Sequence, residues 1–114
     1  MVISQGDVCW ADFGPQLGSR PGYRRPVVVV QCNSFNRSRI ATVVCVPLTG
    51  NAQRADAPGN VLLEESLTGL TKDSVANVSQ LTTLDKVALS DPVGKLPEAK
   101  LQLVLSGIDV VLGR

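Results

Sequence analysis

The chain has 114 residues, enough for one hydrophobic core and too few for two, so we expect a single domain over residues 1–114. Its content of 44% hydrophobic and 18% charged residues is typical of a globular protein. No apolar run approaches the ~20 residues of a membrane-spanning helix, which excludes an integral membrane protein. The N-terminus lacks the basic and apolar regions of a signal peptide, so we expect a cytoplasmic location.

The net charge of +1 hides an uneven distribution along the chain. Residues 1–54 carry six arginines and two aspartates, a charge of +4, whereas residues 55–114 carry five basic and eight acidic side chains, a charge of −3. Arginine binds phosphate well because its planar guanidinium donates two parallel hydrogen bonds. The charge therefore permits an RNA partner, although scattered surface charge explains the same distribution equally well.

The first half of the chain predicts one short strand followed by a long antiparallel hairpin. The short strand covers residues 7–13, and the loop at 14–24 after it holds three glycines and two prolines, so we expect it to be irregular. Residues 26–32 form a continuous β-branched run, typical of a strand buried on both faces, and residues 40–48 form its neighbour. The polar residues 33–39 between them predict a turn.

The second half opens with a Gly- and Pro-rich loop at 50–59 and closes with an amphipathic helix. Pro97 occupies a favoured first-turn position of that helix. An apolar stripe follows at the 3–4 spacing and runs to Leu112. Leu103 and Val110 fall outside the stripe, which indicates either extra core burial or a subunit interface. Between loop and helix we expect short strands at 60–63, 74–81 and 93–96, and one or two helical turns at 83–89. Many short strands and one terminal helix predict a small β-barrel, a mainly β (α+β) fold.

The side chains available for chemistry exclude most kinds of active site. The chain has no histidine, so the usual general base and the nucleophile–His triads are absent. The cysteines show no CxxC spacing and lie in apolar runs, so we expect buried, reduced thiols rather than zinc ligands at Cys9, Cys32 and Cys45. Glu64 and Glu65 are the only adjacent carboxylates, and on a strand edge they would point to opposite faces. No Gly-rich loop is followed by Lys-Ser or Lys-Thr, as in a P-loop. We therefore expect neither a metal nor a cofactor.

One reaction suits a site built from arginine, hydroxyl and backbone N–H groups. RNA carries its own nucleophile, the 2′-OH, beside each phosphate. A protein needs to orient that hydroxyl and to stabilise the extra negative charge of the phosphorane. The products would be a 2′,3′-cyclic phosphate and a 5′-hydroxyl, and DNA would not react by this route.

Four ordered segments, which together span nearly the whole chain, carry a family resemblance. They are Gln5–Pro15, then Gly18-Ser19 with Arg24–Val30, then Val43–Asn51, and finally Asp73–Lys86 running into Val93–Leu96. In these segments the chain resembles the MazF/PemK (Kid-like) endoribonuclease toxins of bacterial toxin–antitoxin systems. The resemblance implies a small SH3-like β-barrel of the MazF/PemK/CcdB type with a C-terminal helix. It also implies a homodimer that cleaves single-stranded RNA sequence-specifically without metal, and a cognate antitoxin whose C-terminal segment occupies the RNA groove.

The same resemblance implies the site residues. Arg25 and Thr49 are the catalytic candidates, facing each other across the barrel mouth below a lid formed by residues 14–24. We expect Arg25 to stabilise the phosphorane; a role as general base would need a strongly perturbed site, because guanidinium stays protonated at neutral pH. Thr49 would donate to a phosphate oxygen, or would only bond backbone at the strand end. The substrate-binding candidates, each with an ordinary structural alternative, are Ser19, Arg24 and Gln80.

The chain also departs from the family pattern. Many members read Gln-Ile-Arg-Thr where this chain reads Gln80-Leu81-Thr82-Thr83, so one positive charge is missing. That difference affects the expected RNA specificity and binding strength and leaves the cleavage class unchanged. We expect Trp10 and Phe35 to pack in the core or at an edge rather than to stack on bases.

Three alternatives remain from the sequence. A CcdB-like toxin of the same fold would poison a protein target without cutting RNA, and it would not need an Arg-Pro strand start opposite a Thr strand end. An SH3-like module for proline-rich peptides lines its groove with several aromatic side chains, and this chain has only four. The third alternative is a catalytically weak family member retained for binding its partner.

Overall fold

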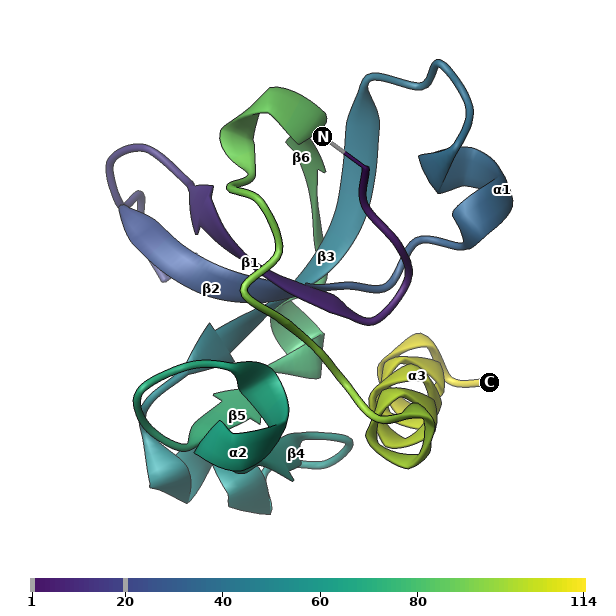
Figure 1. The fold of residues 1–114 in the computed structure, drawn as a ribbon. Coiled ribbons are helices and arrows are strands. Elements are labelled where there is room, and N and C mark those ends of the chain that lie inside the picture. The colour runs from purple at the N-terminus through teal and green to yellow at the C-terminus, as the bar shows by residue number, and fades with distance from the viewer. Residues whose placement is uncertain (1, 20) are drawn as a thin grey trace.

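A curled antiparallel sheet with a helix against one face makes up the fold (Figure 1). The computed structural model describes residues 2–19 and 21–114. The strand order is β4-β5-β3-β2-β1-β7, and β6 also pairs with β3. This half-barrel with a C-terminal helix confirms the fold class expected from the sequence. The strands are β1 (Asp7–Asp12), β2 (Arg24–Val29), β3 (Thr42–Thr49), β4 (Val61–Leu63), β5 (Ser74–Ala76), β6 (Thr82–Asp85) and β7 (Gly94–Lys95).

The helical elements are mostly single turns between strands. Only α3 (Glu98–Leu112) is long, and among the described residues no helix has the length and apolar content needed to cross a bilayer. The others are α1 (Asn33–Asn36), α2 (Glu65–Thr68) and the 3₁₀ turns η1 (Ala52–Asp56), η2 (Val78–Gln80) and η3 (Lys86–Ala88).

The β-branched run in β2 is buried on both faces, as predicted. Val28 belongs to a core cluster that α3 covers, together with Leu63 of β4 and Val104 of α3. Val27 and Val29 point the opposite way, into a second cluster inside the curl. Because successive side chains of a strand alternate between faces, a continuous apolar run is what a strand between two cores requires.

Strand β3 pairs with three other strands, and Pro47 explains why β5 and β6 are two separate strands along its outer edge. One edge of β3 pairs with β2, whereas the other pairs with β6 up to Cys45 and with β5 from Leu48 onward. The Pro47 carbonyl accepts a hydrogen bond from the Asn77 N–H at 3.0 Å, on the side where the chain leaves β5. Proline has no N–H to offer there, so the ladder stops, and the chain turns into η2 before it rejoins as β6.

This interruption makes two of our element predictions wrong. Residues 74–81 form the short strand β5 and the turn η2 rather than one strand. Residues 83–89 form the end of β6 and the turn η3 rather than helix alone, because β3 still offers an unpaired edge there. The predicted strand at 60–63 is confirmed as β4, and the one at 93–96 is reduced to β7.

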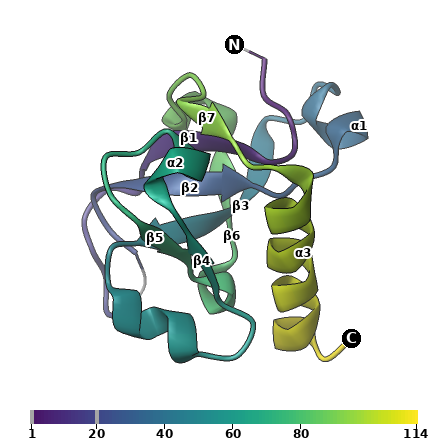
Figure 2. The same cartoon turned by 60° about the horizontal axis from the view of Figure 1, so that its bottom comes forward.

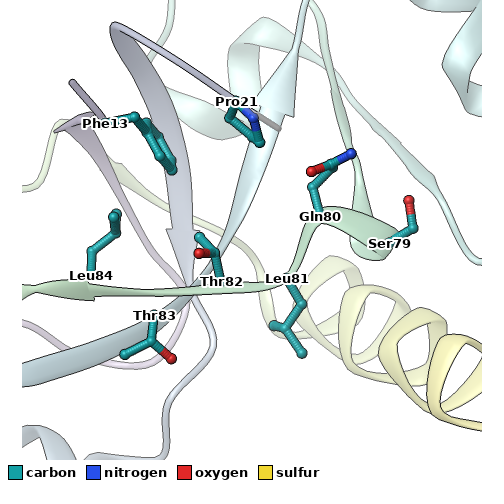
Figure 3. A pocket seen from close by; sticks show the side chains of 8 residues that line it. All are labelled: Phe13, Pro21, Ser79, Gln80, Leu81, Thr82, Thr83 and Leu84. Carbon is teal, nitrogen blue, oxygen red and sulfur yellow. The ribbon is translucent and has the colours of Figure 1, made fainter. Parts of the chain in front are cut away.

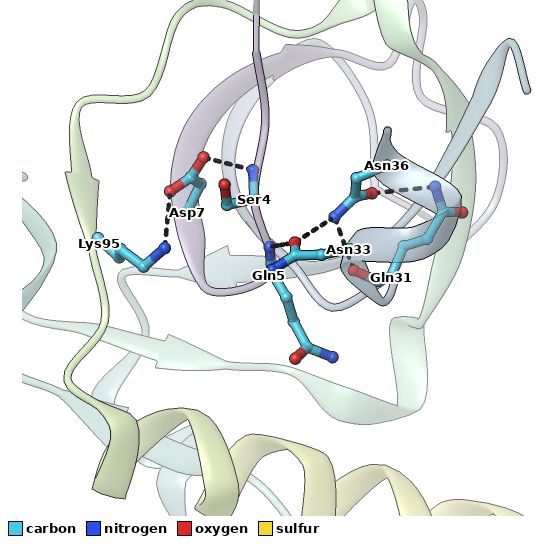
Figure 4. Close-up of polar contacts among 7 residues, drawn as sticks. All are labelled: Ser4, Gln5, Asp7, Gln31, Asn33, Asn36 and Lys95. Carbon is cyan, nitrogen blue, oxygen red and sulfur yellow. Dashed lines mark hydrogen bonds and ion pairs between the residues drawn. The ribbon is translucent and has the colours of Figure 1, made fainter. Parts of the chain in front are cut away.

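The predicted turn at 33–39 contains the helical turn α1, which a polar network holds in place (Figure 4). The buried Asn36 side chain donates to the Gln31 carbonyl at 2.8 Å and accepts from the Gln31 amide at 3.0 Å. Asn33 accepts from the Gln5 backbone N–H at 2.7 Å, which ties the N-terminal segment to α1. Cys32 lies just before α1 and is exposed, so its predicted burial is wrong, whereas Cys9 and Cys45 are buried as predicted.

Helix α3 lies alongside β4 and η2, as Figure 2 shows. Gly107 permits this contact, because a Cβ atom there would lie 2.0 Å from the Gly59 carbonyl oxygen. Pro97 is the N-cap rather than a first-turn residue. Leu103 and Val110 are more than half exposed, so extra burial is wrong for them, and the subunit interface stays a prediction. The buried part of the apolar stripe of α3 ends before Leu112, whose side chain is 58% exposed.

Candidate active site

Three adjoining clefts cross one end of the sheet. We call the middle one, of about 160 Å³, the arginine cleft. It adjoins a cleft of about 280 Å³, which we call the Phe13 cleft; Gln80 and Pro21 line both. It also adjoins a cleft of about 390 Å³, which we call the Trp10 cleft; Arg25 and Leu48 line both. The arginine cleft is lined by Gln16, Ser19, Pro21, Arg25, Pro47, Leu48, Thr49, Arg54, Asn77 and Gln80.

The register of β2 and β3 brings Arg25 and Thr49 to the same place. The two strands are antiparallel and pair Val27 with Pro47. Arg25 lies two residues before Val27 in β2, and Thr49 lies two residues after Pro47 in β3. Because side chains alternate between the two faces of a sheet, Arg25 and Thr49 point to the same face. Both side chains line the arginine cleft, as the sequence analysis expected.

A loop carbonyl orients the half-buried Arg25. Its Nε donates to the Gly22 carbonyl at 3.2 Å, which leaves the terminal NH₂ groups available to a ligand. Gly22 is itself buried below Gln16, and a Cβ atom on it would lie 2.4 Å from the Gln16 Cα. The loop between β1 and β2 therefore crosses itself at Gly22 and covers the cleft with Gln16, Ser19 and Pro21, as a lid would.

The Thr49 hydroxyl makes the backbone contact considered from the sequence, and its donation to a phosphate stays a prediction. Its Oγ1 accepts a hydrogen bond from the Asn51 backbone N–H at 3.2 Å, which is a local strand-end contact. That bond uses a lone pair, so the hydroxyl hydrogen remains free to donate to an oxygen in the cleft.

The arginine cleft is cationic. Arg25 and Arg54 line it, and no carboxylate is found among its described lining residues. The ion pairs within the described part of the chain join Lys95 to Asp7 and Arg114 to Asp109, away from the cleft. Two guanidinium groups without carboxylate partners are an arrangement suited to a phosphate.

Arg24 and Gln80 occupy different clefts. Gln80 ends η2 and lines the arginine cleft, as expected. Arg24 is exposed and lies over the Trp10 ring, with its guanidinium carbon 4.8 Å from the ring centroid, in the Trp10 cleft. Because Arg24 and Arg25 are successive residues of one strand, they point to opposite faces and cannot both enter the arginine cleft.

The chain is similar to known proteins both in sequence and in fold. A family model described as the PemK-like, MazF-like toxin of type II toxin–antitoxin systems matches residues 4–112. This chain belongs to that family. "Endoribonuclease MazF2" of Mycobacterium bovis is 46% identical over 112 residues, which is 98% of both chains. The crystal structure of MazF (Form-I) from Deinococcus radiodurans aligns with a TM-score of 0.83 and 25% identity, over 100% of this chain and 99% of that chain. A mycobacterial endoribonuclease in complex with its cognate antitoxin aligns with a TM-score of 0.77 and 27% identity, over 97% and 95%.

The departure from the usual MazF/PemK motif falls in the Phe13 cleft, shown in Figure 3. Thr82 lines this cleft beside Gln80 and opposite Phe13. Thr82 contributes a neutral hydroxyl, and the Phe13 cleft has no charged side chain among its described lining residues.

The sequence analysis missed Arg54 and Asn77. Arg54 lies in η1, within the loop that follows β3, and Asn77 joins β5 to η2. The position of Arg54 five residues after Thr49 was a usable signal, whereas Asn77 reaches the cleft only through the break in the strand. The Phe35 side chain is 54% exposed, which excludes packing in the core and leaves the edge position expected for it, whereas Trp10 is half-buried under Arg24.

Proposed function

We propose that this chain is a sequence-specific endoribonuclease toxin, an mRNA interferase that cleaves single-stranded RNA without metal. The observation that carries the proposal is the cationic arginine cleft, in which Arg25 and Thr49 meet with no carboxylate among the described lining residues. The relatives and the structural neighbours named endoribonuclease support it. They do not favour the CcdB-like alternative, a protein poison that leaves RNA intact.

We propose a role for each side chain in this reaction, based on its position in the cleft. The terminal NH₂ groups of Arg25 donate to the non-bridging oxygens of the scissile phosphate, where negative charge grows as the phosphorane forms. The Thr49 hydroxyl adds a neutral donor. The 2′-oxygen forms a bond to phosphorus and loses its proton, while the bond from phosphorus to the 5′-oxygen breaks and that oxygen gains a proton. We therefore give Arg25 the role of charge stabiliser, because a planar guanidinium offers parallel donors to two phosphate oxygens.

The remaining lining residues hold the substrate. Gln80 offers an amide at the border of the arginine and Phe13 clefts, where it reaches a base edge or a sugar. Ser19 brings a hydroxyl from the lid, and Arg54 a second cation. Arg24 binds from the Trp10 cleft rather than beside Arg25.

The proposal extends to partners and location. We propose one domain over residues 1–114, supported by the family match to residues 4–112. We propose a homodimer in the cytoplasm, neutralised by the C-terminal segment of a cognate antitoxin. The antitoxin complex of a structural neighbour supports the last point.

The test is incubation of the purified protein with a long mixed-sequence RNA in EDTA. We expect discrete fragments that end in 2′,3′-cyclic phosphate and 5′-hydroxyl, identified by mass spectrometry. The same RNA with 2′-deoxyribose at a mapped cleavage site should stay intact at that site. Intact RNA would show that the chain is not a nuclease, and cleavage that needs added Mg²⁺ would refute the metal-independent mechanism.

A further inference from the structure

The Trp10 cleft has a composition that phosphate binding alone does not need. It borders the arginine cleft through Arg25 and has more than twice its volume, about 390 Å³ against about 160 Å³. Two of the chain's four aromatic side chains, Trp10 and Tyr23, line it together with Arg24 and Lys72. No carboxylate is found among its described lining residues.

Tyr23 lines this cleft in an energetically unfavourable backbone conformation. Its φ is +59°, the one positive value among the described non-glycine residues, in a region where a side chain costs roughly 1–2 kcal/mol. The backbone is fixed there because the Tyr23 carbonyl accepts from the Phe13 N–H at 2.8 Å and the Tyr23 N–H donates to the Gly14 carbonyl. The ring is nevertheless 67% exposed, so burial of this side chain does not compensate for the strain.

Trp10 and Arg24 form a second flat surface in the same cleft. The Arg24 guanidinium lies over the indole ring at 4.8 Å, which holds the exposed arginine in a fixed orientation. Planar guanidinium and aromatic rings are the surfaces on which unpaired bases stack.

A further cation lies beside the strand end that carries Thr49. The Lys72 ammonium is 2.9 Å from the position that a Cβ atom on Gly50 would take. Lys72 is exposed, and no carboxylate within the described ranges forms an ion pair with it. The Trp10 cleft therefore combines base-sized stacking surfaces with positive charge, directly beside the proposed catalytic arginine.

We propose that the Trp10 cleft binds the base of a nucleotide next to the scissile phosphate, stacked on Tyr23 and the Arg24–Trp10 pair, with Lys72 on a neighbouring phosphate. This inference rests on the proposed nuclease function and assigns part of its substrate specificity to one cleft. The uncharged Phe13 cleft adjoins the arginine cleft through Gln80, whereas the Trp10 cleft adjoins it through Arg25, so an RNA strand that occupies all three clefts would cross the arginine cleft in the middle.

Trp10 is the only tryptophan of the chain, so its fluorescence reports on this cleft alone. The probe is an RNA oligonucleotide around a mapped cleavage site, with 2′-deoxyribose at the cleaved nucleotide so that it binds without reacting. We expect it to quench Trp10. A series with one abasic nucleotide at each flanking position should contain a member that loses the quenching and binds roughly tenfold more weakly.

The matching variants separate stacking from folding. Asparagine tolerates a positive φ, so Tyr23→Asn removes the ring without adding backbone strain. We expect it to raise Kd and KM roughly tenfold and to leave kcat within about twofold, while Tyr23→Phe behaves like the unaltered protein. Phe35→Ala is the control, since Phe35 is an exposed aromatic side chain on α1 that lines none of the clefts.

The outcomes distinguish this inference from the function on which it rests. If RNA is cleaved but every abasic probe binds like the intact one and Tyr23→Asn is unaltered, the cleft does not hold a base. If Tyr23→Asn weakens only an antitoxin peptide, the cleft binds protein and the inference is overturned. Absence of any cleavage in the unaltered protein would instead refute the proposed function.

Discussion

The two halves of β2 differ in polarity and in burial, although the strand has only six residues. Arg24, Arg25 and Pro26 are exposed or half-buried and border the clefts, whereas Val27–Val29 are completely buried. In strand β3 the residues Cys45–Leu48 are buried, and Thr49 at the cleft end is half-buried, as is Thr42 at the other end. Antiparallel pairing brings the end of β3 beside the polar start of β2, so the arginine cleft lies at this end of the two strands and their buried core lies next to it.

The difference shows how a small chain separates stability from function. Apolar side chains on both faces of the sheet supply the burial that drives folding, and the polar strand ends add little to it. Substitutions at the cleft end should therefore change activity without unfolding the protein, and substitutions at the core end should do the reverse. The following experiments test that division.

The largest effect is expected for Arg25→Ala. Loss of a preorganised donor to a developing oxyanion costs about 10²–10³-fold in kcat. Folding should be preserved, because Arg25 is half-buried and its side chain makes one hydrogen bond to a described residue, the Gly22 carbonyl. Cleavage rates and thermal melting of the same preparation measure both properties. Arg39→Ala, an exposed arginine outside the clefts, is the control. If Arg25→Ala cleaves RNA at near the original rate, Arg25 is not part of the active site.

The core end should respond in the opposite way to Leu63→Ala. Leu63 is completely buried between the sheet and α3, and such truncations cost about 2–5 kcal/mol of unfolding free energy. Its neighbour Leu62 is 43% exposed, so Leu62→Ala should cost less than about 1 kcal/mol. Urea denaturation of both variants gives the comparison. Equal losses would show that burial in β4 does not contribute to stability as described.

A smaller and purely kinetic effect is expected at Thr49. Thr49→Val keeps the shape of the side chain and removes the hydroxyl, which should lower kcat about tenfold if the hydroxyl donates to the phosphate. Thr49→Ser should retain most of the activity. A fall in both kcat and melting temperature for Thr49→Val would indicate that the bond with Asn51 is the main role of the hydroxyl.

The cysteines offer the mildest probe of the same contrast. Burial raises the pKa of Cys9 to about 11 and that of Cys45 to about 12, whereas a hydrogen bond with the Ser34 side chain lowers the pKa of the exposed Cys32. The thiolate is the reactive form, so iodoacetamide should modify Cys32 alone, at a rate that rises with pH through a midpoint below that of an ordinary thiol. Peptide mass spectrometry counts the modified sites. Alkylation of Cys45 in the native protein would show that the core opens.

The family resemblance pointed to Arg25 and Thr49, and strand register explains why the two lie in one cleft. A valine run bounded by Arg-Pro at one end marks where β2 enters the core, and the antiparallel neighbour ends at Thr49. The separation of Arg24 from Arg25 into two clefts was not predicted, although strand alternation explains it. Arg54 and Asn77 were missed because each lies on a loop whose path depends on distant contacts.

The sequence by itself determined that the fold is a sheet with a terminal helix, because apolar periodicity is a local property. It also determined that the site works without histidine, because the chain has none. The tertiary structure alone decided where β5 stops, since that depends on the missing N–H of Pro47 on another strand. It also decided that Cys32 is exposed and that Tyr23 and Trp10 border one cleft. Those outcomes depend on residues far apart in the chain, whose proximity is fixed only when the sheet curls.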